Sequence, residues 1–583
     1  MKTNILIKIV SLTIAVLSVS CNDLDLVQQD AANSENWYQN EEQFRQSLNE
    51  GYRTTFFPVD GYEGAYSPGW DDDTHFRNRV GTITGGTVDS EFWVAETNWS
   101  NVYRGINRMI TVLEEVKAQD GKLSEIKAEQ FEAEAKFLLG VYWSYLITHY
   151  GDVPFFETSI PVKESFTISR TDKNVILAKV YDYFDFSSEY LPDSYDGLTY
   201  ATKGAALAYK ARVAIYMGDN ATAAVAAKAC MDLKVYELHP DFASLFVSSN
   251  KSSKEIIFKV PRSIDLLSSV NTNYMYYHMP RNNSGWSSYS PSWQLLAAFE
   301  CVDGLPIDES PMFDPKNPFK NRDPRLLETI IPFGSLIDGD GLPADTGSVF
   351  LKKEYNPHPG HTKIMNYETG ALQTNKDTRV ANTNSSWNGL LWKKGIDDDW
   401  IDFQADNDKI LMRYADVLLM YAESKIELGE IDATVLKAIN DVRGRAYASS
   451  AFTNPAVTTT DQDKLRYIVR NERRSEFAYE GLRYMDLIRW RLADVILDGF
   501  KVYGLPETSK IKDDLKNDSF DDYWFWGVKP ELDENGVANF DALVEAGFAR
   551  QLTSFTFPER QYLFPIPANE RRLNENLSQN EDY

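Results

Sequence analysis

Three acidic residues near the C-terminal end of the sequence have a spacing that catalysis could use. Glu472, Glu476 and Glu480 are each four residues apart, so on a helix they would share one face. Paired carboxylates carry out general acid and base catalysis in glycoside hydrolases. The segment therefore raises the question of a hydrolytic enzyme.

The arginines of the same segment favour a structural answer. Alternating charges at helical spacing predict a ladder of ion pairs, which neutralises carboxylates in place. A glycosidase acid instead needs a raised pKa in apolar surroundings. We therefore expect residues 472–489 to stabilise the fold and the protein to have no catalytic residues. The interleaved residues are Arg473, Arg474 and the alternating series Glu480, Arg483, Asp486 and Arg489.

Aromatic residues in polar, glycine-rich stretches offer a different chemistry. A flat ring covers the apolar face of a sugar, and planar polar side chains bind the hydroxyl groups around its rim. Two such runs occur, at 66–99 and 274–289. They predict a glycan site formed by Trp70, Asp72, Arg77, Trp93 and Trp99 from the first run, and by Tyr276, Tyr277, Asn283, Trp286 and Tyr289 from the second.

The alternative for each ring is that it fixes a loop onto the rest of the fold. Trp70 and Trp286 are the strongest platform candidates, because glycine and polar neighbours predict that they are not buried. Trp99 opens a predicted helix, where packing is the simpler interpretation. Trp387 and Trp392 form a third and weaker candidate.

Motifs for metals and nucleophiles are weak. His358 and His361 are close in sequence, but no cysteine or acidic cluster with ligand spacing accompanies them. The acidic runs at 71–73 and 338–340 could hold a structural calcium ion, yet turn chemistry explains them more simply. The sequence has neither a GxSxG elbow nor a phosphate-binding P-loop. We expect neither a metal site nor a cofactor.

Helical periodicity dominates the segments that must position these loops. Apolar residues recur at steps of three and four over 131–149, 205–217, 222–233, 411–426 and 435–445. Short Gly/Asp turns join 205–217 to 222–233 and 411–426 to 435–445, which predicts tetratricopeptide-like hairpins.

Strand signals are few, and Glu255–Val260 is the clearest. Long irregular stretches separate the helices, at 56–98, 262–294 and 334–408. Loops of this length are usually functional or disordered, and their aromatic content argues against disorder. The sequence therefore predicts a mostly α-helical fold with long loop-rich excursions and a few short strands.

The first residues indicate export. Lys2 and Lys8 form a basic start, and the apolar stretch Ile5–Val19 is too short to span a membrane. Small residues precede Cys21, whose thiol can take a diacylglycerol once residues 1–20 are removed. The alternative is an ordinary secretory signal with an incidental cysteine. We expect a lipoprotein anchored through Cys21.

Charge and cysteine content narrow the remaining possibilities. The net charge of −26 repels phosphates, so we expect no nucleic acid partner. Cys230 and Cys301 are the other two cysteines, too few for a disulfide framework in an exported chain of 583 residues. They are predicted to be small buried residues.

Four segments together resemble the SusD/RagB family, the outer-membrane nutrient-binding lipoproteins of Bacteroidota. They are 132–156 (containing HYGDVPFF), 413–443 (RYADVLLMYAE), 471–490 (NERRSEFAYEGLRYMDLIRW) and the C-terminal 564–583. Leu139 stands where the family often has Arg, and Glu581-Asp582 replaces a common Pro-Gly. Neither departure touches the expected ligand site.

The resemblance implies a single domain over residues 21–583 with about four tetratricopeptide-like units. Its expected parts are an N-terminal half with the first ligand loop (21–235), a loop-rich insertion with the second (236–408) and a C-terminal helical half (409–583). In the family, glycan contacts come from these two loop regions.

The resemblance also implies partners and a location. They are a glycan, a SusC-like TonB-dependent transporter, and the outer membrane, with the protein lipid-anchored on its extracellular face. Three alternatives stay open: peptide capture as in the RagB branch, a glycoside hydrolase, and a pure scaffold.

Overall fold

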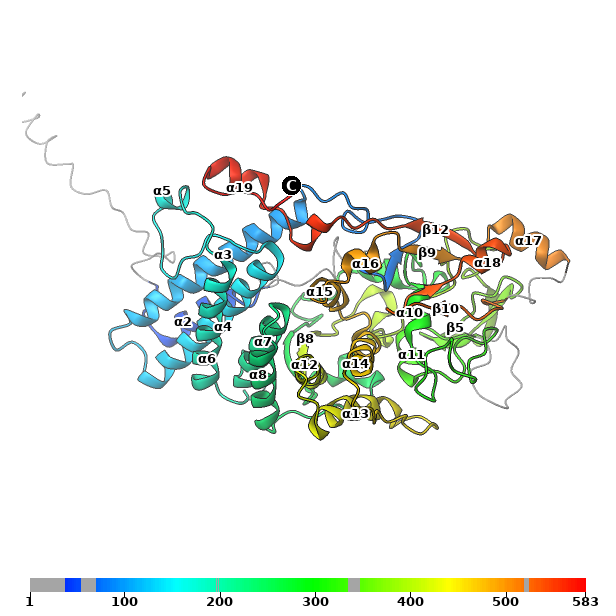
Figure 1. The fold of residues 1–583 in the computed structure, drawn as a ribbon, viewed down its shortest axis with the longest axis horizontal. Coiled ribbons are helices and arrows are strands. Elements are labelled where there is room, and N and C mark those ends of the chain that lie inside the picture. The colour runs from blue at the N-terminus through cyan, green and yellow to red at the C-terminus, as the bar shows by residue number, and fades with distance from the viewer. Residues whose placement is uncertain (1–36, 54–69, 196, 198, 334–346, 518–523) are drawn as a thin grey trace, which may run out of the picture.

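The protein is mostly helical, as the sequence predicts. The computed structural model describes residues 37–53, 70–195, 197, 199–333, 347–517 and 524–583. Figure 1 shows helices α2 to α8 side by side at one end, α12 to α14 in the middle, and most of the short strands at the other end. Among the described residues, no helix combines the length and apolarity needed to cross a membrane.

Most of the long helices belong to the N-terminal half and to residues 414–477. They are α2 (Glu41–Glu50), α3 (Trp93–Lys117), α4 (Glu125–Tyr150), α6 (Lys173–Tyr190), α7 (Lys203–Tyr216), α8 (Asn220–Asp232), α12 (Tyr414–Glu427), α13 (Ala433–Tyr447) and α14 (Gln462–Phe477). The shorter ones are α5 (Val162–Ser165), α9 (Thr272–His278), α10 (Trp293–Ala298), α11 (Pro324–Thr329), α15 (Arg483–Arg489), α16 (Ala493–Leu497), α17 (Thr508–Lys516), α18 (Asp541–Glu545) and α19 (Ala568–Leu573).

Strands and 3-10 turns fill the irregular parts. Antiparallel pairs join β1 (Thr74–Phe76) to β3 (Tyr289–Pro291), β2 (Ile256–Val260) to β8 (Lys409–Arg413), β9 (Lys501–Gly504) to β12 (Arg550–Ser554), and β10 (Glu531–Leu532) to β11 (Ala538–Asn539). A four-stranded meander contains β4 (Ser348–Phe350), β5 (Lys353–Tyr355), β6 (Lys363–Asn366) and β7 (Ala371–Thr374). The 3-10 turns are η1 (Ala243–Phe246), η2 (Ser248–Asn250), η3 (Arg281–Asn283), η4 (Asp398–Phe403) and η5 (Glu559–Tyr562).

Consecutive helices pack into hairpins. Helix α3 packs on α4, α4 on α6, α6 on α7 and α7 on α8, and the series continues through α12 to α13 and α14. Gly218 (φ +82°) makes the turn between α7 and α8, and the Asp219 side chain caps α8 by accepting from Thr222 N. Gly429 (φ +70°) and Asp432 do the same between α12 and α13. The predicted helical hairpins are confirmed.

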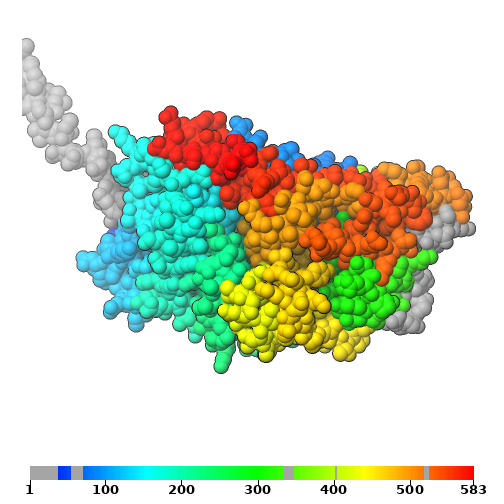
Figure 2. Space-filling model, in the orientation of Figure 1, coloured from blue at the N-terminus to red at the C-terminus, as the bar shows by residue number. Residues whose placement is uncertain are grey.

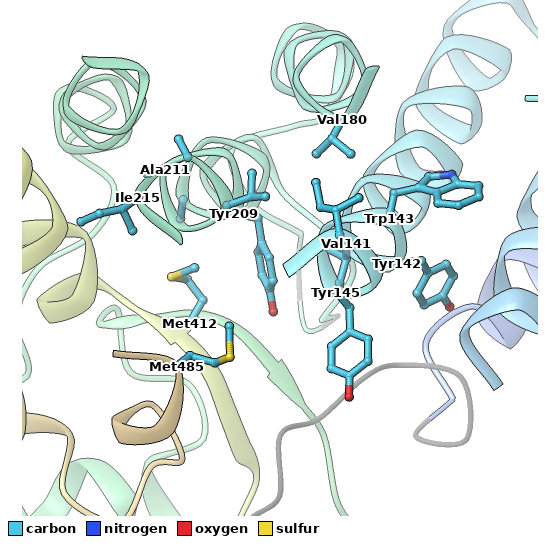
Figure 3. Packing of buried hydrophobic residues seen from close by; sticks show 14 of the residues in the cluster. Val141, Tyr142, Trp143, Tyr145, Val180, Tyr209, Ala211, Ile215, Met412 and Met485 are labelled. Carbon is cyan, nitrogen blue, oxygen red and sulfur yellow. The ribbon is translucent and has the colours of Figure 1, made fainter. Parts of the chain in front are cut away.

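Helix α4 is buried on nearly every side in its C-terminal half, which is why its sequence from Phe137 to Leu146 carries little polar character. Figure 3 shows Val141 of α4 and Val180 of α6 facing each other, with Tyr209 of α7 beside them. Burying a side chain such as Val141 contributes about 1.5–3 kcal/mol. The helical half is therefore held by one continuous apolar core.

The loop-rich part has a second apolar core of its own. It includes Trp293, Trp392 and Trp526, and it joins residues 270–405 to 478–549. Cys301 lies in this core and Cys230 in the first; both are buried and unbonded, as predicted. The irregular stretches are thus packed structure where they are described.

One predicted helix is interrupted. The sequence indicated one face shared by Glu472, Glu476 and Glu480, but α14 ends at Phe477 and α15 begins at Arg483. Tyr479 (φ +67°) and Gly481 (φ +83°) make the break. The prediction of a shared helix face is therefore wrong for Glu480, because the chain turns to pack against the loop-rich core.

The C-terminal segment packs on the N-terminal helices. Figure 2 shows the last residues, in red, lying on the cyan surface of the helical half. Phe564 N donates to His149 O, and Arg170 donates to the Asn580 side chain and to Ser578 O. Two segments that resemble the same family, 132–156 and 564–583, are thus neighbours in space.

Candidate functional site

A short strand pair brings the two predicted ligand regions together. β1 and β3 pair in antiparallel register, with Phe76 opposite Tyr289 and His75 opposite Ser290. The ring centroids of Phe76 and Tyr289 are 4.9 Å apart. Residues separated by about two hundred positions in the sequence therefore share one surface.

Five rings form an aromatic cluster on this surface: Phe76, Tyr276, Tyr277, Trp286 and Tyr289. Tyr276 and Trp286 are stacked, with centroids 5.3 Å apart and planes 20° from parallel. Tyr277 contacts Trp286 and Tyr289 edge-on, with both centroids at 5.0 Å. Trp286 is 38% exposed, so part of its side chain is open to solvent.

The stack extends to a residue that the sequence did not indicate. Phe403, at the end of η4, stacks on Tyr276 with a centroid distance of 3.8 Å. Tyr276 thus contacts Phe403 and Trp286, which makes a run of three rings. Phe403 lies in a polar stretch without periodicity, and its sequence carries no signal for this contact.

The backbone holds Trp286 firmly. Trp286 N donates to Tyr276 O at 2.6 Å, and Ser288 N donates to Tyr277 O at 2.8 Å. Gly285 is required at the bend, since a Cβ there would lie 2.1 Å from Met279 O. The indole is therefore presented on a fixed loop, which lowers the entropic cost of binding a ligand.

Two of the predicted polar residues support the same surface. Arg77 Nη2 donates to the carbonyl oxygens of Trp286 at 3.0 Å and Asn384 at 3.2 Å. Asn283 Nδ2 donates to Leu351 O at 3.1 Å. The structure therefore gathers Arg77, Tyr276, Tyr277, Asn283, Trp286 and Tyr289 around one site.

Trp70 has a different position from the one expected. It is only 7% exposed, and it makes edge contacts with Tyr484 (5.2 Å) and Phe564 (5.8 Å). The prediction that its polar neighbours leave it unburied is wrong, because the C-terminal half packs over it. A ring enclosed in this way offers no open face to a sugar.

Asp72 is also buried, in an ion-pair cluster. Its carboxylate accepts from Arg483 Nε at 2.8 Å and Nη2 at 2.9 Å, and from Arg474 Nη2 at 2.8 Å. Burial alone would raise the pKa of Asp72, but the two guanidinium groups hold it well below its usual value. Its oxygens are committed to arginines and not directed at solvent, which contradicts its expected role at the ligand.

The remaining tryptophans of the first run belong to helix α3. Trp99 is 3% exposed and packs on Tyr103 and Tyr150, so the packing alternative holds and an exposed platform is contradicted. Trp93 is the first residue of α3 and is 48% exposed. Glu96, one turn further along α3, accepts a hydrogen bond from Asn569 of α19, so this end of α3 lies beside α19.

The two rings of the third aromatic candidate, Trp392 and Trp387, have different surroundings. Trp392 is fully buried and stacks on Tyr479 at 4.3 Å, as a core residue does. Trp387 is half-buried, and the guanidinium groups of Arg379 and Arg550 lie 4.8 and 4.9 Å from its ring centroid. Trp387, three residues after Asn384 in the sequence, therefore lies against two guanidinium groups.

The acidic residues of 472–480 are held by arginines. Glu476 accepts from Arg413 Nη1 at 2.6 Å, from Arg325 Nη1 at 3.0 Å and from Arg445 Nη2. Burial opposes ionisation, yet these three cations hold the pKa of Glu476 well below its usual value. The predicted neutralisation by arginine is confirmed.

The partners, however, come mostly from elsewhere in the chain. Of the predicted ladder, Asp486 and Arg489 do pair, whereas Glu480 binds Arg413 and Lys394, and Arg483 binds Asp72. The local ladder is therefore replaced by a network that ties distant segments together.

No group of three or more metal-ligating side chains occurs among the described residues. His358 Nδ1 accepts from Gly360 N, and His361 lies 3.2 Å from Glu354. Residues 338–340, the second calcium candidate, lie outside the described residues, as does Cys21.

A hollow lined in part by Tyr274 is separate from the aromatic cluster. It has a volume of about 720 Å³ and is lined in part by Tyr274, Trp400, Lys394 and Glu480. Lys394 Nζ is fully engaged there, by Glu476 O, Ala478 O and Glu480. Lys394 and Glu480 are thus committed to each other within the fold, so the open stack at Trp286 is the better ligand candidate.

Comparisons with known proteins agree with the fold. A model described as the SusD family matches residues 254–583, and a second, described as starch-binding associating with outer membrane, matches residues 75–215. SusD-like protein P25 of Formosa agariphila is 26% identical over 421 residues, covering 70% of this chain and 73% of that protein.

Two further comparisons point the same way. SusD-like protein P2 of the same organism is 24% identical over 467 residues, covering 78% of this chain and 74% of that protein. A crystal structure of a SusD-like carbohydrate-binding protein from Bacteroides fragilis superposes with a TM-score of 0.73 at 25% identity, covering 93% of this chain and 99% of that one.

Proposed function

The chain belongs to the SusD family, and on that premise we propose that it is a non-catalytic glycan-binding lipoprotein of the cell surface. It captures an oligosaccharide or polysaccharide and delivers it to a SusC-like, TonB-dependent transporter in the outer membrane. The energy for transport comes from the transporter, and this chain supplies recognition.

The observation that carries the proposal is the ring stack that ends at Trp286. Its exposed indole, backed by Tyr276 and Phe403, is a rigid flat surface of the kind that covers the apolar face of a sugar. Arg77 and Asn283 stabilise the loops that present it, since Arg77 donates to Trp286 O and Asn283 donates to Leu351 O. The similar B. fragilis protein, described as carbohydrate-binding, supports the same ligand class.

The absence of catalysis is supported by the state of the carboxylates. Glu472 and Glu476 are both fully buried and paired with arginines. A general acid has to reach the scissile bond with a proton available near neutral pH. Neither carboxylate has access to solvent, and three arginines hold the pKa of Glu476 well below its usual value.

The location rests on the N-terminal sequence and on the family. Cys21 follows a stretch with the basic start and apolar run expected of a secretory signal, and a second matching family is described as associating with the outer membrane. An acyl chain on Cys21 would tether the binding surface beside the transporter. Replacing Cys21 by Ala is expected to release the protein from the membrane fraction of cells that express the full chain.

A binding assay tests the ligand class. Purified protein is titrated calorimetrically with a panel of oligosaccharides, and Trp286→Ala is expected to weaken the best binder by about 1–3 kcal/mol, the range for a central aromatic contact. Phe452→Ala is the matched control, since Phe452 is 40% exposed in the turn after α13. Glycan binding that Trp286→Ala leaves unchanged would refute this site, and tight binding of peptides in place of glycans would refute the ligand class.

Two further assays test the absence of catalysis and the delivery of the glycan to a transporter. Incubation with each glycan that binds, followed by analysis of reducing ends, is expected to show no turnover. Affinity purification of the full chain from its native membrane is expected to recover a TonB-dependent transporter, and its repeated absence under mild detergent would contradict the delivery role.

A further inference from the structure

An arginine cluster lies against the proposed glycan surface. Arg77 Nη2 donates to Asn384 O at 3.2 Å, and Arg281 donates to the same oxygen from Nε at 3.0 Å and Nη2 at 2.9 Å. Two cationic groups thus converge on one neutral carbonyl oxygen. Their mutual repulsion is not offset by a carboxylate at that point.

Two more arginines extend the cluster at Trp387, which lies three residues after Asn384 in the sequence. The guanidinium groups of Arg379 and Arg550 lie on the Trp387 ring, at 4.8 and 4.9 Å from its centroid. Arg379 is only 5% exposed. The name arginine cluster is used below for Arg77, Arg281, Arg379 and Arg550.

Little negative charge balances these four residues. In the described part of the chain, Arg550 pairs with Glu507, and the other three form no ion pair within 4 Å. The nearest acid to Arg281 is the buried Asp377, whose pKa burial raises to about 7. Burial, together with the positive charges of Arg550 and Arg77, lowers the pKa of Arg379 to about 10.

Several donors of the cluster are also unsatisfied. Buried nitrogen atoms without a hydrogen-bond partner include Nε of Arg77, Nε of Arg379, Nε and Nη2 of Arg550, and Nε1 of Trp387. A buried donor left unpaired costs about 1–3 kcal/mol. The guanidinium groups of the cluster are therefore incompletely satisfied by the described part of the chain.

The cluster contrasts with three other buried arginines of the protein, although Arg322, a single buried arginine, also donates to backbone carbonyl oxygens. Arg413, Arg473 and Arg489 each bind two or more carboxylates. In a chain of net charge −26, arginines are readily neutralised, so four that are grouped and poorly paired require another explanation.

We infer that the arginine cluster binds an acidic group of the glycan, a carboxylate or a sulfate ester, next to the sugar ring held by Trp286. Guanidinium groups recognise both anions through paired hydrogen bonds. Arg77 joins the two parts of the site, since one of its nitrogens bonds both Trp286 O and Asn384 O. The inference rests on the proposed function, because it names the class of glycan that the same site takes.

The test compares three oligosaccharide types of matched length: neutral, uronate-containing and sulfated. Calorimetric titration at low and high ionic strength is expected to show tighter binding of one or both acidic types, weakened by salt. Arg281→Gln and Arg550→Gln are each expected to reduce affinity for the acidic glycan about tenfold, the loss for one charge-assisted hydrogen bond, while neutral binding stays constant. The uronate and sulfate arms distinguish the two sources of charge.

Arg466→Gln is the matched control. Arg466 is a half-buried arginine of α14, and it is paired with Glu427 of α12 and Asp463 of α14. Thermal unfolding confirms that each variant is folded. Neutral glycans binding as tightly as both acidic types would overturn the inference and leave the proposed function standing. Failure of all three types to bind would overturn both.

Discussion

Arg77 donates a hydrogen bond from Nη2 to the backbone carbonyl oxygen of Trp286 at 3.0 Å, although 209 positions separate them. The contact follows from the β1–β3 register, which places Phe76 opposite Tyr289. It fixes the Trp286 loop to the first ligand region. The candidate site is therefore formed where two loop regions pair with each other. Substitutions outside it should change the stability of the protein and leave glycan binding unchanged.

Trp70→Ala is expected to destabilise the protein by about 3–5 kcal/mol, since a large ring leaves a cavity between Tyr484 and Phe564. Glycan affinity of the folded variant should equal that of the parent protein. Urea unfolding and calorimetric titration measure the two quantities. A loss of affinity with unchanged stability would show that Trp70 contacts the ligand after all.

Asp72→Asn is expected to cost about 3 kcal/mol, because it leaves Arg483 buried beside a neutral amide and leaves Arg474 with Asp73 as its carboxylate partner. The exposed pair Lys437–Asp441 gives the control: Asp441→Asn should change the free energy of unfolding by about 0.5 kcal/mol or less. Equal effects for the two variants, measured by urea unfolding, would contradict the structural role of Asp72.

Glu476→Gln is expected to destabilise the fold without changing any activity towards glycans. The substitution leaves Arg325, Arg413 and Arg445 with one negative charge fewer in a fully buried position, at a cost of about 3–5 kcal/mol. Chemical unfolding and a reducing-end assay are the measurements. Turnover by the parent protein that disappears in this variant would establish a hydrolase.

Stability should depend on pH through Asp377. Burial raises the pKa of its carboxyl to about 7, although the backbone N–H groups of Arg281 and Asn282 donate to it. The Asp377 carboxyl therefore loses its proton at a lower pH in the unfolded chain than in the folded protein. Its contribution to stability is fully present below the pKa of the unfolded chain and is lost as the pH rises through the pKa of the folded protein.

The isosteric Asp377→Asn lacks this titration. The difference in unfolding free energy between parent and variant is therefore expected to fall by about 1–3 kcal/mol between pH about 5 and about 8. Urea unfolding of both proteins across this range provides the measurement. A difference that is constant, or that grows with pH, would show that Asp377 is ionised throughout.

Much of the helical architecture was predictable because it depends on local rules. The periodicity of 131–149 and the Gly218-Asp219 turn specify α4 and the α7–α8 hairpin through burial and capping, which involve neighbours in sequence. The break between α14 and α15 was not predictable in this way. Charge spacing continues through Glu480, while the chain turns at Tyr479 and Gly481 because the loop-rich core requires it.

The features of the candidate site fall into the same two groups: those that the local sequence indicates and those that depend on tertiary packing. The sequence by itself determined that aromatic and polar residues are concentrated in two loop regions, and it correctly pointed to Trp286 as exposed. Only the tertiary structure decided that Trp70, Asp72 and Trp99 are enclosed, that Phe403 stacks on Tyr276, that Arg281 shares Asn384 O with Arg77, and that Arg379 and Arg550 lie on Trp387. Burial and the choice of charge partners depend on which distant segments pack together, and no local spacing encodes that.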